Sequence, residues 1–396
     1  MNKENRNQTI KFLTAQTVSL LGSSLVQYAI IWTITLRTSS GFMMSMATLC
    51  GYLPQIFISL FAGVWIDRYS RKLMIMIPDA LIALSTLLVA ILYISGYQEI
   101  WLLFVVLIIR SIGTGIQTPA VNAFLPEIVD KDQLMKVNGL NSTLTSLIMF
   151  ISPALSGLIL SLTTIEYAFF IDVVTAIIGV GVMFGVHAKQ SLNETKKETM
   201  VTNIKQGFDY LKTNPTILSH LFFFMIIMLL ISPAAFFTPL LVSRTFGAEL
   251  WRLSFSEMSF SIGAILGGFL ITTWGGFKNR NFTIVLATTI YGLMMVGIGF
   301  STTFITYILF NTLVGITLPC CSAPSNVLLQ EEVEPQMLGR VFSILQIASS
   351  CSLPLGSALF GPLGDIVPIQ LIILTCGGFV VLTSAIRFIV IKKTAK

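Results

Sequence analysis

The chain has 396 residues, of which 54% are hydrophobic and only 11% are charged. Soluble domains carry about 25% charged residues, so this composition excludes a water-soluble globular protein and indicates that lipid surrounds most of the chain. The net charge of +6 comes from cations scattered over short loops, which argues against a nucleic-acid-binding face and is typical of the positive-inside pattern of membrane proteins.

Apolar stretches long enough to cross a bilayer recur along the whole sequence. A transmembrane helix needs about 20 predominantly apolar residues. By this measure the sequence predicts twelve spans, at residues 12–36, 43–65, 73–95, 100–122, 135–162, 166–187, 215–241, 253–273, 282–300, 303–327, 339–362 and 367–390. We therefore expect an all-α membrane protein.

The loop cations set the expected orientation. With the N-terminus inside the cell, most Lys and Arg residues lie on the cytoplasmic side, and only Arg37, Arg244 and Arg252 fall outside. We therefore expect a multi-pass protein whose N- and C-termini are both cytoplasmic.

The first predicted span has a polar face. Gln16, Ser19, Ser23 and Gln27 are spaced so that they fall on one side of a helix. Polar side chains in membrane helices face the bundle interior or a water-filled cavity. We expect Gln16, Ser23 and Gln27 to line a central cavity.

A short, charged loop joins the second and third predicted spans. Gly63 permits close helix approach because it has no side chain, and Asp67 is suited to bind a helix N-terminus, where backbone N–H groups favour an anion. Arg68, Arg71 and Lys72 could serve only to orient the protein in the membrane, but this role does not account for the presence of Gly63 or Asp67. This loop resembles the signature loop between spans 2 and 3 of the major facilitator superfamily of secondary transporters, which implies a gate element.

Arg110 lies about ten residues into the fourth predicted span, hence ~15 Å along the helix and close to the membrane midplane. An arginine there costs at least about 2.5–3.5 kcal/mol on insertion scales, so it should face a partner or a cavity. It is either part of a structural ion pair, or a functional group that controls a nearby acid or binds a polar part of a substrate. Thr114 and Gln117 extend its polar stripe, and residues 110–117 resemble the span 4 arginine motif of the same superfamily, to which proton coupling is attributed.

The fifth predicted span carries Ser152, Pro153, Ser156 and Gly157. This segment resembles the antiporter motif of exporters, Gly-Pro-x-x-Gly-Gly, with serine at two glycine positions. Small residues and a proline still permit close packing and bending. A generic membrane-helix kink is the alternative interpretation.

Asp172, in the sixth predicted span, is the acid best placed to titrate. It lies six residues after Glu166, so about 9 Å from the outer interface. It either carries a coupling proton or is a permanently ionised partner of Arg110. We expect Asp79 to pair with loop cations rather than to bind protons, and the sequence is compatible with a merely solvated Glu257 near the outer face.

The long polar stretch at residues 188–214 divides the predicted spans six and six. Residues 1–187 are expected to form an N-terminal six-helix bundle and residues 215–396 a C-terminal one. Within the linker, Ile204, Phe208 and Leu211 share one helical face, which predicts a helix on the membrane surface.

The two halves share an internal repeat. Asn122, Glu127 and Lys136 are matched by Asn326, Glu331 and Arg340, each 204 residues later and with no gap. Two parallel six-helix repeats are the architecture of major facilitator transporters.

Further segments, at residues 109–114, 171–173, 257–263 and 338–343, recur at matching places in one family. With them, the whole chain resembles the macrolide efflux proteins of the drug:proton antiporter group. The resemblance implies the major facilitator fold in a bacterial cell membrane. It also implies proton-coupled efflux of hydrophobic drugs, macrolide-type antibiotics foremost, by alternating access.

The expected partners are a small hydrophobic substrate, protons and the lipid bilayer, and we expect a monomer. Arg110 and Asp172 are the expected proton-coupling residues. The sequence offers no nucleophile–base pair, metal-ligand cluster or Walker-type motif, so we expect neither an enzyme, nor a cofactor, nor a metal site. The alternatives are a transporter of an endogenous metabolite on the same fold and, in a different class, a non-transporting membrane sensor.

Overall fold

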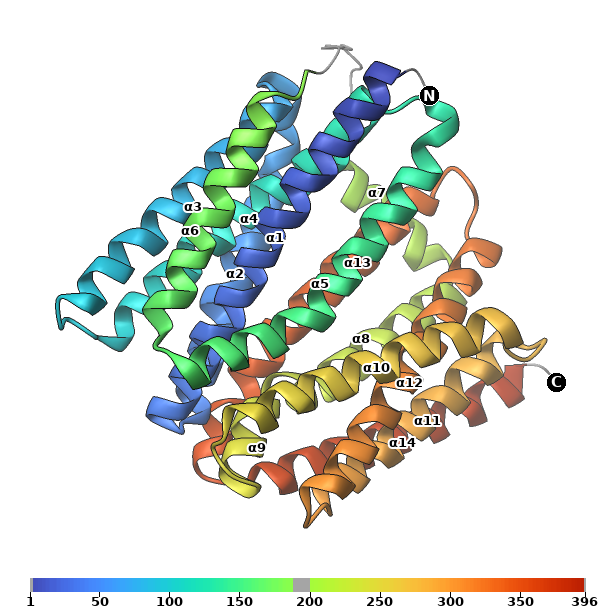
Figure 1. The fold of residues 1–396 in the computed structure, drawn as a ribbon. Helices are drawn as coiled ribbons and strands as arrows, with labels where there is room; N and C mark the ends of the chain where they lie inside the picture. The colour runs from blue at the N-terminus through green and yellow to red at the C-terminus, as the bar shows by residue number, and fades with distance from the viewer. Residues whose placement is uncertain (1–2, 188–199, 395–396) are drawn as a thin grey trace. The chain divides into compact units, whose positions relative to one another are not determined.

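The computed structural model describes residues 3–187 and 200–394, and the regular elements in these ranges are all helical (Figure 1). The α-helices are α1 (Lys3–Thr38), α2 (Gly41–Arg68), α3 (Arg71–Ile94), α4 (Ile100–Ile128), α5 (Leu134–Leu162), α6 (Ile165–Phe184), α7 (Met200–Thr213), α8 (Pro215–Phe236), α9 (Thr238–Thr245), α10 (Leu250–Trp274), α11 (Arg280–Gly299), α12 (Phe304–Glu332), α13 (Leu338–Phe360) and α14 (Ile369–Thr394). Two short 3₁₀ helices, η1 (Lys131–Gln133) and η2 (Pro362–Asp365), follow α4 and α13.

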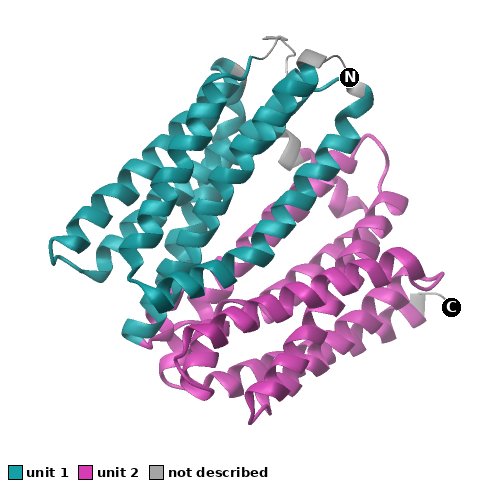
Figure 2. Ribbon diagram, viewed as in Figure 1, with its two compact units in different colours: residues 1–38, 46–196 teal, residues 39–45, 197–396 magenta. Residues whose placement is uncertain are grey.

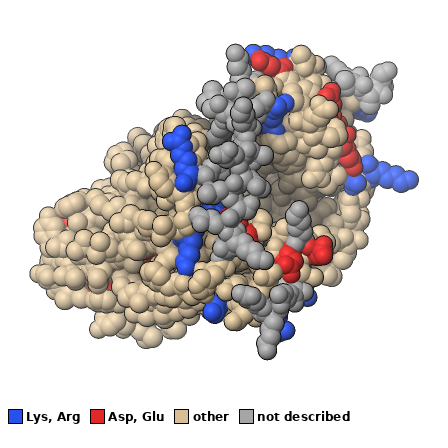
Figure 3. Space-filling view, turned by 90° about the horizontal axis from the view of Figure 1, so that it is seen from above, with Lys and Arg blue, Asp and Glu red and all other residues tan. Residues whose placement is uncertain are grey.

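Twelve helices in the described ranges are long and apolar enough to cross a membrane, which confirms the predicted number of spans. On the face drawn in Figure 3, charged side chains form isolated islands among other residues, as the low charge content requires. Some boundaries differ from the prediction. The seventh span ends at Phe236 rather than 241, because Pro239 has no N–H with which to continue the helix and lies in the first turn of α9.

The chain divides into two compact units (Figure 2). Unit 1 contains Met1–Thr38 and Met46–Lys196, and unit 2 contains Ser39–Ser45 and Lys197–Lys396. In unit 1, α1 packs on α5 and α6, and α3 packs on α4 and α6. In unit 2, α10 packs on α12, α11 on α12 and α14, and α8 on α13 and α14.

Part of the predicted surface linker, residues 188–199, lies outside the described ranges. Its remainder forms α7, which packs on α8 and α13. Of the predicted apolar face, Leu211 is buried in a core cluster of unit 2, Phe208 is exposed, and the side chain of Ile204 is not among those described.

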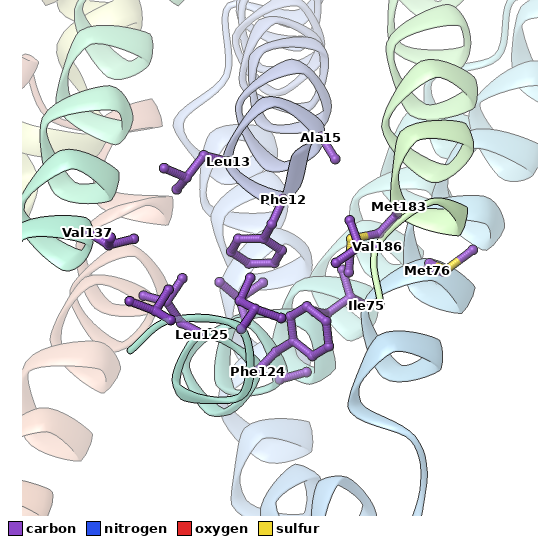
Figure 4. Packing of buried hydrophobic residues seen from close by; sticks show 14 of the residues in the cluster. Phe12, Leu13, Ala15, Ile75, Met76, Phe124, Leu125, Val137, Met183 and Val186 are labelled. Carbon is purple, nitrogen blue, oxygen red and sulfur yellow. The ribbon is translucent and has the colours of Figure 1, made fainter. Parts of the chain in front are cut away.

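A hydrophobic cluster closes one end of unit 1, where all six helices α1 to α6 contribute side chains (Figure 4). Phe12 and Phe124 point toward one another with ring centroids 5.4 Å apart. Val137 and Met183 join the same cluster from α5 and α6. The cluster fixes the ends of the helices whose middle sections carry the charged residues described below.

The internal repeat of the sequence is visible in the helix boundaries. Helix α4 begins at residue 100 and ends at 128, whereas α12 begins at 304 and ends at 332, so both boundaries differ by 204. The next helices, α5 and α13, begin at 134 and 338, again 204 residues apart. Positions 204 residues apart in these helices therefore correspond.

Close packing between α10 and α12 depends on glycine. A Cβ added at Gly263 would meet the backbone carbonyl of Thr312, and one added at Gly267 would meet that of Ile316. Gly315 of α12 is equally close to α10. Small residues four apart are the usual means by which membrane helices approach so closely.

Asp365 fixes the start of α2 within unit 2. Its carboxylate accepts hydrogen bonds from the backbone N–H groups of Gly41 (2.6 Å) and Phe42 (2.9 Å) and from the Ser40 hydroxyl (2.8 Å). Arg244 pairs with the same carboxylate at 3.1 Å. An acid at the N-terminus of a helix satisfies N–H groups that have no partner within the helix.

Candidate functional site

Arg110 and Asp172 form a buried ion pair in unit 1. Nη1 of Arg110, on α4, donates to Oδ2 of Asp172, on α6, at 2.6 Å. The two residues are 5% and 1% exposed. The sequence predicts both as coupling residues, and the structure brings them into direct contact.

Two further helices complete the surroundings of this pair. Nη2 of Arg110 donates to the backbone carbonyl of Ser23 on α1 at 2.6 Å. The hydroxyl of Thr86 on α3 donates to Oδ2 of Asp172 at 3.3 Å, and that of Ser23 lies 3.5 Å from Oδ1. Four helices thus meet at one pair of charges. A buried charge without a partner is strongly destabilising. If either side chain lost its charge, the other would be left unpaired, and the ion pair would no longer connect these four helices.

Asp79 is a second buried acid of unit 1, and its predicted pairing with loop cations is wrong. Its Oδ1 accepts a hydrogen bond from Nε2 of Gln117 at 2.8 Å. The nearby loop cation Arg71 pairs instead with Glu127 at 2.9 Å. Because Asp79 lies eight residues inside α3, the amide on the adjacent helix reaches it, and it is buried away from the loop.

The other residues predicted to line a cavity have different surroundings. The hydroxyl of Thr114 donates to the backbone carbonyl of Arg110, at 2.9 Å, which ties it to its own helix. Gln16 and Gln27 are half-buried. The amide nitrogen of Gln27 lies 3.4 Å from where a Cβ at Gly51 would stand, so this side chain lies between α1 and α2.

The cations of the loop between α2 and α3 have structural contacts within unit 1. Arg71 also donates to the carbonyl of Ala123, at 2.9 Å, and so connects the start of α3 to the end of α4. Lys72 donates to the carbonyl of Phe184, the last residue of α6, and to that of Val186 just after the helix, both at 2.9 Å. Cations there satisfy carbonyls that the helix leaves unpaired.

For the remaining residues of this loop, the structure does not show the contacts that a gate element would be expected to make. Arg68 is exposed, and the side chain of Asp67 lies outside the described part of the structure. A Cβ added at Gly63 would meet no heavy atom within 4 Å, so the close helix approach predicted at this glycine is not seen. Gly63 is exposed on the surface of α2.

The exporter-like segment of α5 is buried. Ser152, Pro153, Ser156 and Gly157 are all buried, and Pro153 lies inside the helix. Among the residues that the structure describes, the hydroxyls of Ser152 and Ser156 have no hydrogen-bond partner. The segment therefore combines a helix-bending proline with small residues on a packed face.

Unit 2 contains a pocket that the sequence does not indicate. It has a volume of about 290 Å³ and is lined by residues of α8 to α13. Its walls are mainly apolar, with Met228, Ile231, Phe260, Val314 and Leu353 among them. Glu257, for which the sequence suggests only a solvated position, lies in this wall, and its side chain is half-buried.

A polar network holds the helix that carries Glu257. The amide of Asn311 on α12 donates to the carbonyl of Ser256 at 2.8 Å and to the hydroxyl of Ser259 at 2.9 Å. The Ser256 and Tyr307 hydroxyls lie 2.6 Å apart. These bonds, together with the glycine contacts between α10 and α12, fix the position of the glutamate in the pocket wall.

Comparison with known proteins agrees with this architecture. The family model of the Major Facilitator Superfamily matches residues 12–357. Macrolide efflux protein A of Streptococcus pyogenes is 31% identical over 373 residues, covering 91% of each chain. Macrolide efflux protein A of Enterococcus faecalis is 28% identical over 323 residues, covering 80% of this chain and 99% of that protein.

Solved transporters share the fold. The crystal structure of the nucleoside transporter NupG, as its D323A mutant, superimposes with a TM-score of 0.75 at 15% sequence identity and covers 97% of this chain and 99% of that chain. With its membrane-spanning helices and this match to the family model, the chain belongs to the Major Facilitator Superfamily and is a multi-pass membrane transporter, not an enzyme.

Proposed function

We propose that this transporter exports hydrophobic drugs, macrolide-type antibiotics foremost, across a bacterial cell membrane in exchange for protons, by alternating access. The names of its relatives in Streptococcus pyogenes and Enterococcus faecalis support the direction and the substrate class. The buried contact between Arg110 and Asp172 is the observation that supports proton coupling.

The coupling step in this proposal is the transfer of a proton to Asp172. Protonation neutralises the carboxylate and removes its charge–charge attraction to Arg110, which leaves the guanidinium without a counter-ion inside unit 1. Helices α1, α3, α4 and α6 then adopt a second arrangement that gives Arg110 other acceptors. Loss of the proton restores the pair, so each proton bound and released drives one conformational cycle.

The roles of the two helix bundles, the charged loop and Pro153 are inferred from the sequence. The six-helix bundles of residues 1–187 and 215–396 are the two moving halves of a monomer, and both termini are cytoplasmic. The loop with Gly63, Asp67, Arg68, Arg71 and Lys72 acts as a cytoplasmic gate element. Pro153, which lies inside α5, supplies flexibility to this helix.

The test is the accumulation of a radiolabelled macrolide in bacteria that lack their own exporters, with and without this protein, before and after a protonophore. The proposal requires lower accumulation in cells that carry the protein, and loss of the difference when the protonophore is added. If accumulation is unchanged although the protein is present in the membrane, macrolides are not its substrates. The result would then favour a transporter of the same fold with a different substrate.

A matched pair of variants assigns the coupling residue. Asp172→Asn should abolish the protonophore-sensitive difference in accumulation. Asp132→Asn, which changes an exposed carboxylate outside the buried network, should preserve it.

A further inference from the structure

Glu257 combines a carboxylate with a largely apolar pocket. The pocket is lined by Met228, Ile231, Ser232, Ala234, Ala235, Thr238, Ser256, Glu257, Phe260, Tyr291, Asn311, Val314, Leu318, Ser349, Ser352 and Leu353. This set contains one acid and no Lys, Arg or His. Its polar members other than Glu257 are neutral, so the wall of the pocket supplies no counter-charge.

Glu257 also has no counter-ion elsewhere in the parts of the chain that the structure describes, residues 3–187 and 200–394. None of the ion pairs there includes it, and no side chain donates a hydrogen bond to its carboxylate. The nearest basic residue on its own helix, Arg252, pairs with Glu249 at 3.3 Å. An ionised carboxylate in such surroundings has no charged partner within the described part of the protein, and a cation bound in the pocket would supply one.

The internal repeat explains why the protein's own cation is missing here. The α12 side of the pocket consists of Asn311, Val314 and Leu318, which correspond to Leu107, Arg110 and Thr114 of α4. In unit 1 this helix face provides the arginine that neutralises Asp172. In unit 2 the same face is apolar at the corresponding position, so the second half presents an acid without an arginine.

We infer that Glu257 is the specificity-determining residue for cationic drugs: its carboxylate binds the protonated amine of an amphipathic molecule whose apolar part lies against the pocket wall. This inference rests on the proposed drug-export function. The apolar side chains Met228, Ile231 and Phe260 provide contact area for the ligand body. Ser349 and Ser352 line the same pocket, and their hydroxyls offer additional acceptors to a ligand.

The size of the pocket limits what it holds. A volume of about 290 Å³ lies at the lower end of the range for ligand sites, roughly 300–1,000 Å³. It suits an aromatic ring system or a single amino sugar rather than a whole macrocycle. The pocket therefore recognises the cationic end of a large amphipathic drug.

The test is equilibrium binding to the purified full-length protein in detergent, where no ion gradient is needed. Two derivatives of the macrolide erythromycin serve as probes. One is permanently cationic, because its amine is quaternised by methylation, and the other is neutral, because its amine is demethylated and acetylated. Glu257→Gln should weaken binding of the cationic probe about tenfold, or about 1.4 kcal/mol, and leave the neutral probe within about twofold.

Controls separate this role from a structural one. Glu334→Gln, at an exposed glutamate outside the pocket, should leave both affinities unchanged. Equal losses for both probes on Glu257→Gln would show a structural role, and an unchanged affinity for the cationic probe would show that the carboxylate does not bind it; either result overturns the inference.

A third probe keeps the inference separate from the proposed function. If neither macrolide derivative binds the wild-type protein, the macrolide assignment fails, and tetraphenylphosphonium, an apolar permanent cation, decides the role of Glu257. Binding of tetraphenylphosphonium that weakens about tenfold in Glu257→Gln supports the inference, and equal binding to both proteins, or none to the wild type, overturns it.

Discussion

Val314 occupies in α12 the position that Arg110 occupies in α4, 204 residues earlier. The two halves of the repeat therefore use the same helix face for different purposes. In unit 1 the arginine forms a buried ion pair with Asp172. In unit 2 the valine lines a pocket that contains the acid Glu257, which has no ion-pair partner in the described ranges 3–187 and 200–394. This difference agrees with our two proposals, in which Asp172 in unit 1 binds the proton and Glu257 in unit 2 binds the cationic drug.

Removing one partner of the buried pair should destabilise the protein more than removing both. Arg110→Met or Asp172→Leu alone leaves an uncompensated buried charge, and we expect each to lower the unfolding free energy by about 3–5 kcal/mol. The double variant should recover most of that loss but remain inactive in transport. Thermal unfolding in detergent, read alongside transport, checks this, and additive losses in the double variant would contradict a direct interaction.

Asp79 should be dispensable for coupling, although it is buried in the same unit. Asp79→Asn keeps a side chain that accepts a hydrogen bond from Gln117, so the contact between α3 and α4 survives. We expect drug accumulation in cells carrying Asp79→Asn to remain sensitive to a protonophore, unlike that with Asp172→Asn. Loss of this sensitivity in Asp79→Asn alone would move the coupling site to Asp79.

The sequence predicted the spans and identified Arg110 and Asp172 as functional residues for simple reasons, but it did not show that the two are in contact. Each span is a long apolar run, and Arg110 and Asp172 are charges so deep in apolar segments that each needs a partner. The contact of Asp79 with Gln117 was missed, because a choice between loop cations and an amide on the next helix depends on helix rotation and packing.

The pocket around Glu257 was not predictable for a related reason. Its wall is assembled from six helices, α8 to α13, and none of them alone has a distinctive pattern there. Glu257 lies near the start of a span, where an exposed glutamate is common. Two signals were available in the sequence. The glycines of α10 indicate close packing between α10 and α12, and the internal repeat shows that Val314 occupies the position that corresponds to Arg110.

The glycine contact between α10 and α12 should be sensitive to a single methyl group. In Gly267→Ala the new Cβ would meet the carbonyl of Ile316, and we expect a loss of about 1–3 kcal/mol or more because backbone has to shift. Gly268→Ala is the matched control, since nothing lies within 4 Å of its Cβ position. Thermal unfolding of the two variants in detergent should separate them clearly, and equal stabilities would show that α10 and α12 are not in such close contact.

Lys72 should contribute modestly to stability through the end of α6. Lys72→Met removes the donor to the carbonyls of Phe184 and Val186, and we expect a loss of about 0.3–1 kcal/mol. Lys278→Met changes an exposed lysine and serves as the control for loss of a surface charge. If both variants unfold at the same temperature as the wild type, this lysine does not stabilise the end of α6.

The most direct test of proton-coupled export uses purified protein in proteoliposomes with an imposed pH difference. Uptake of a labelled macrolide into acid-loaded vesicles, together with proton release, is the quantity to measure for the wild type and for Asp172→Asn. We expect gradient-driven uptake with proton release in the wild type and neither in the variant. Uptake of equal size in both proteins, or uptake that ignores the pH difference, would contradict proton coupling through the Arg110–Asp172 pair.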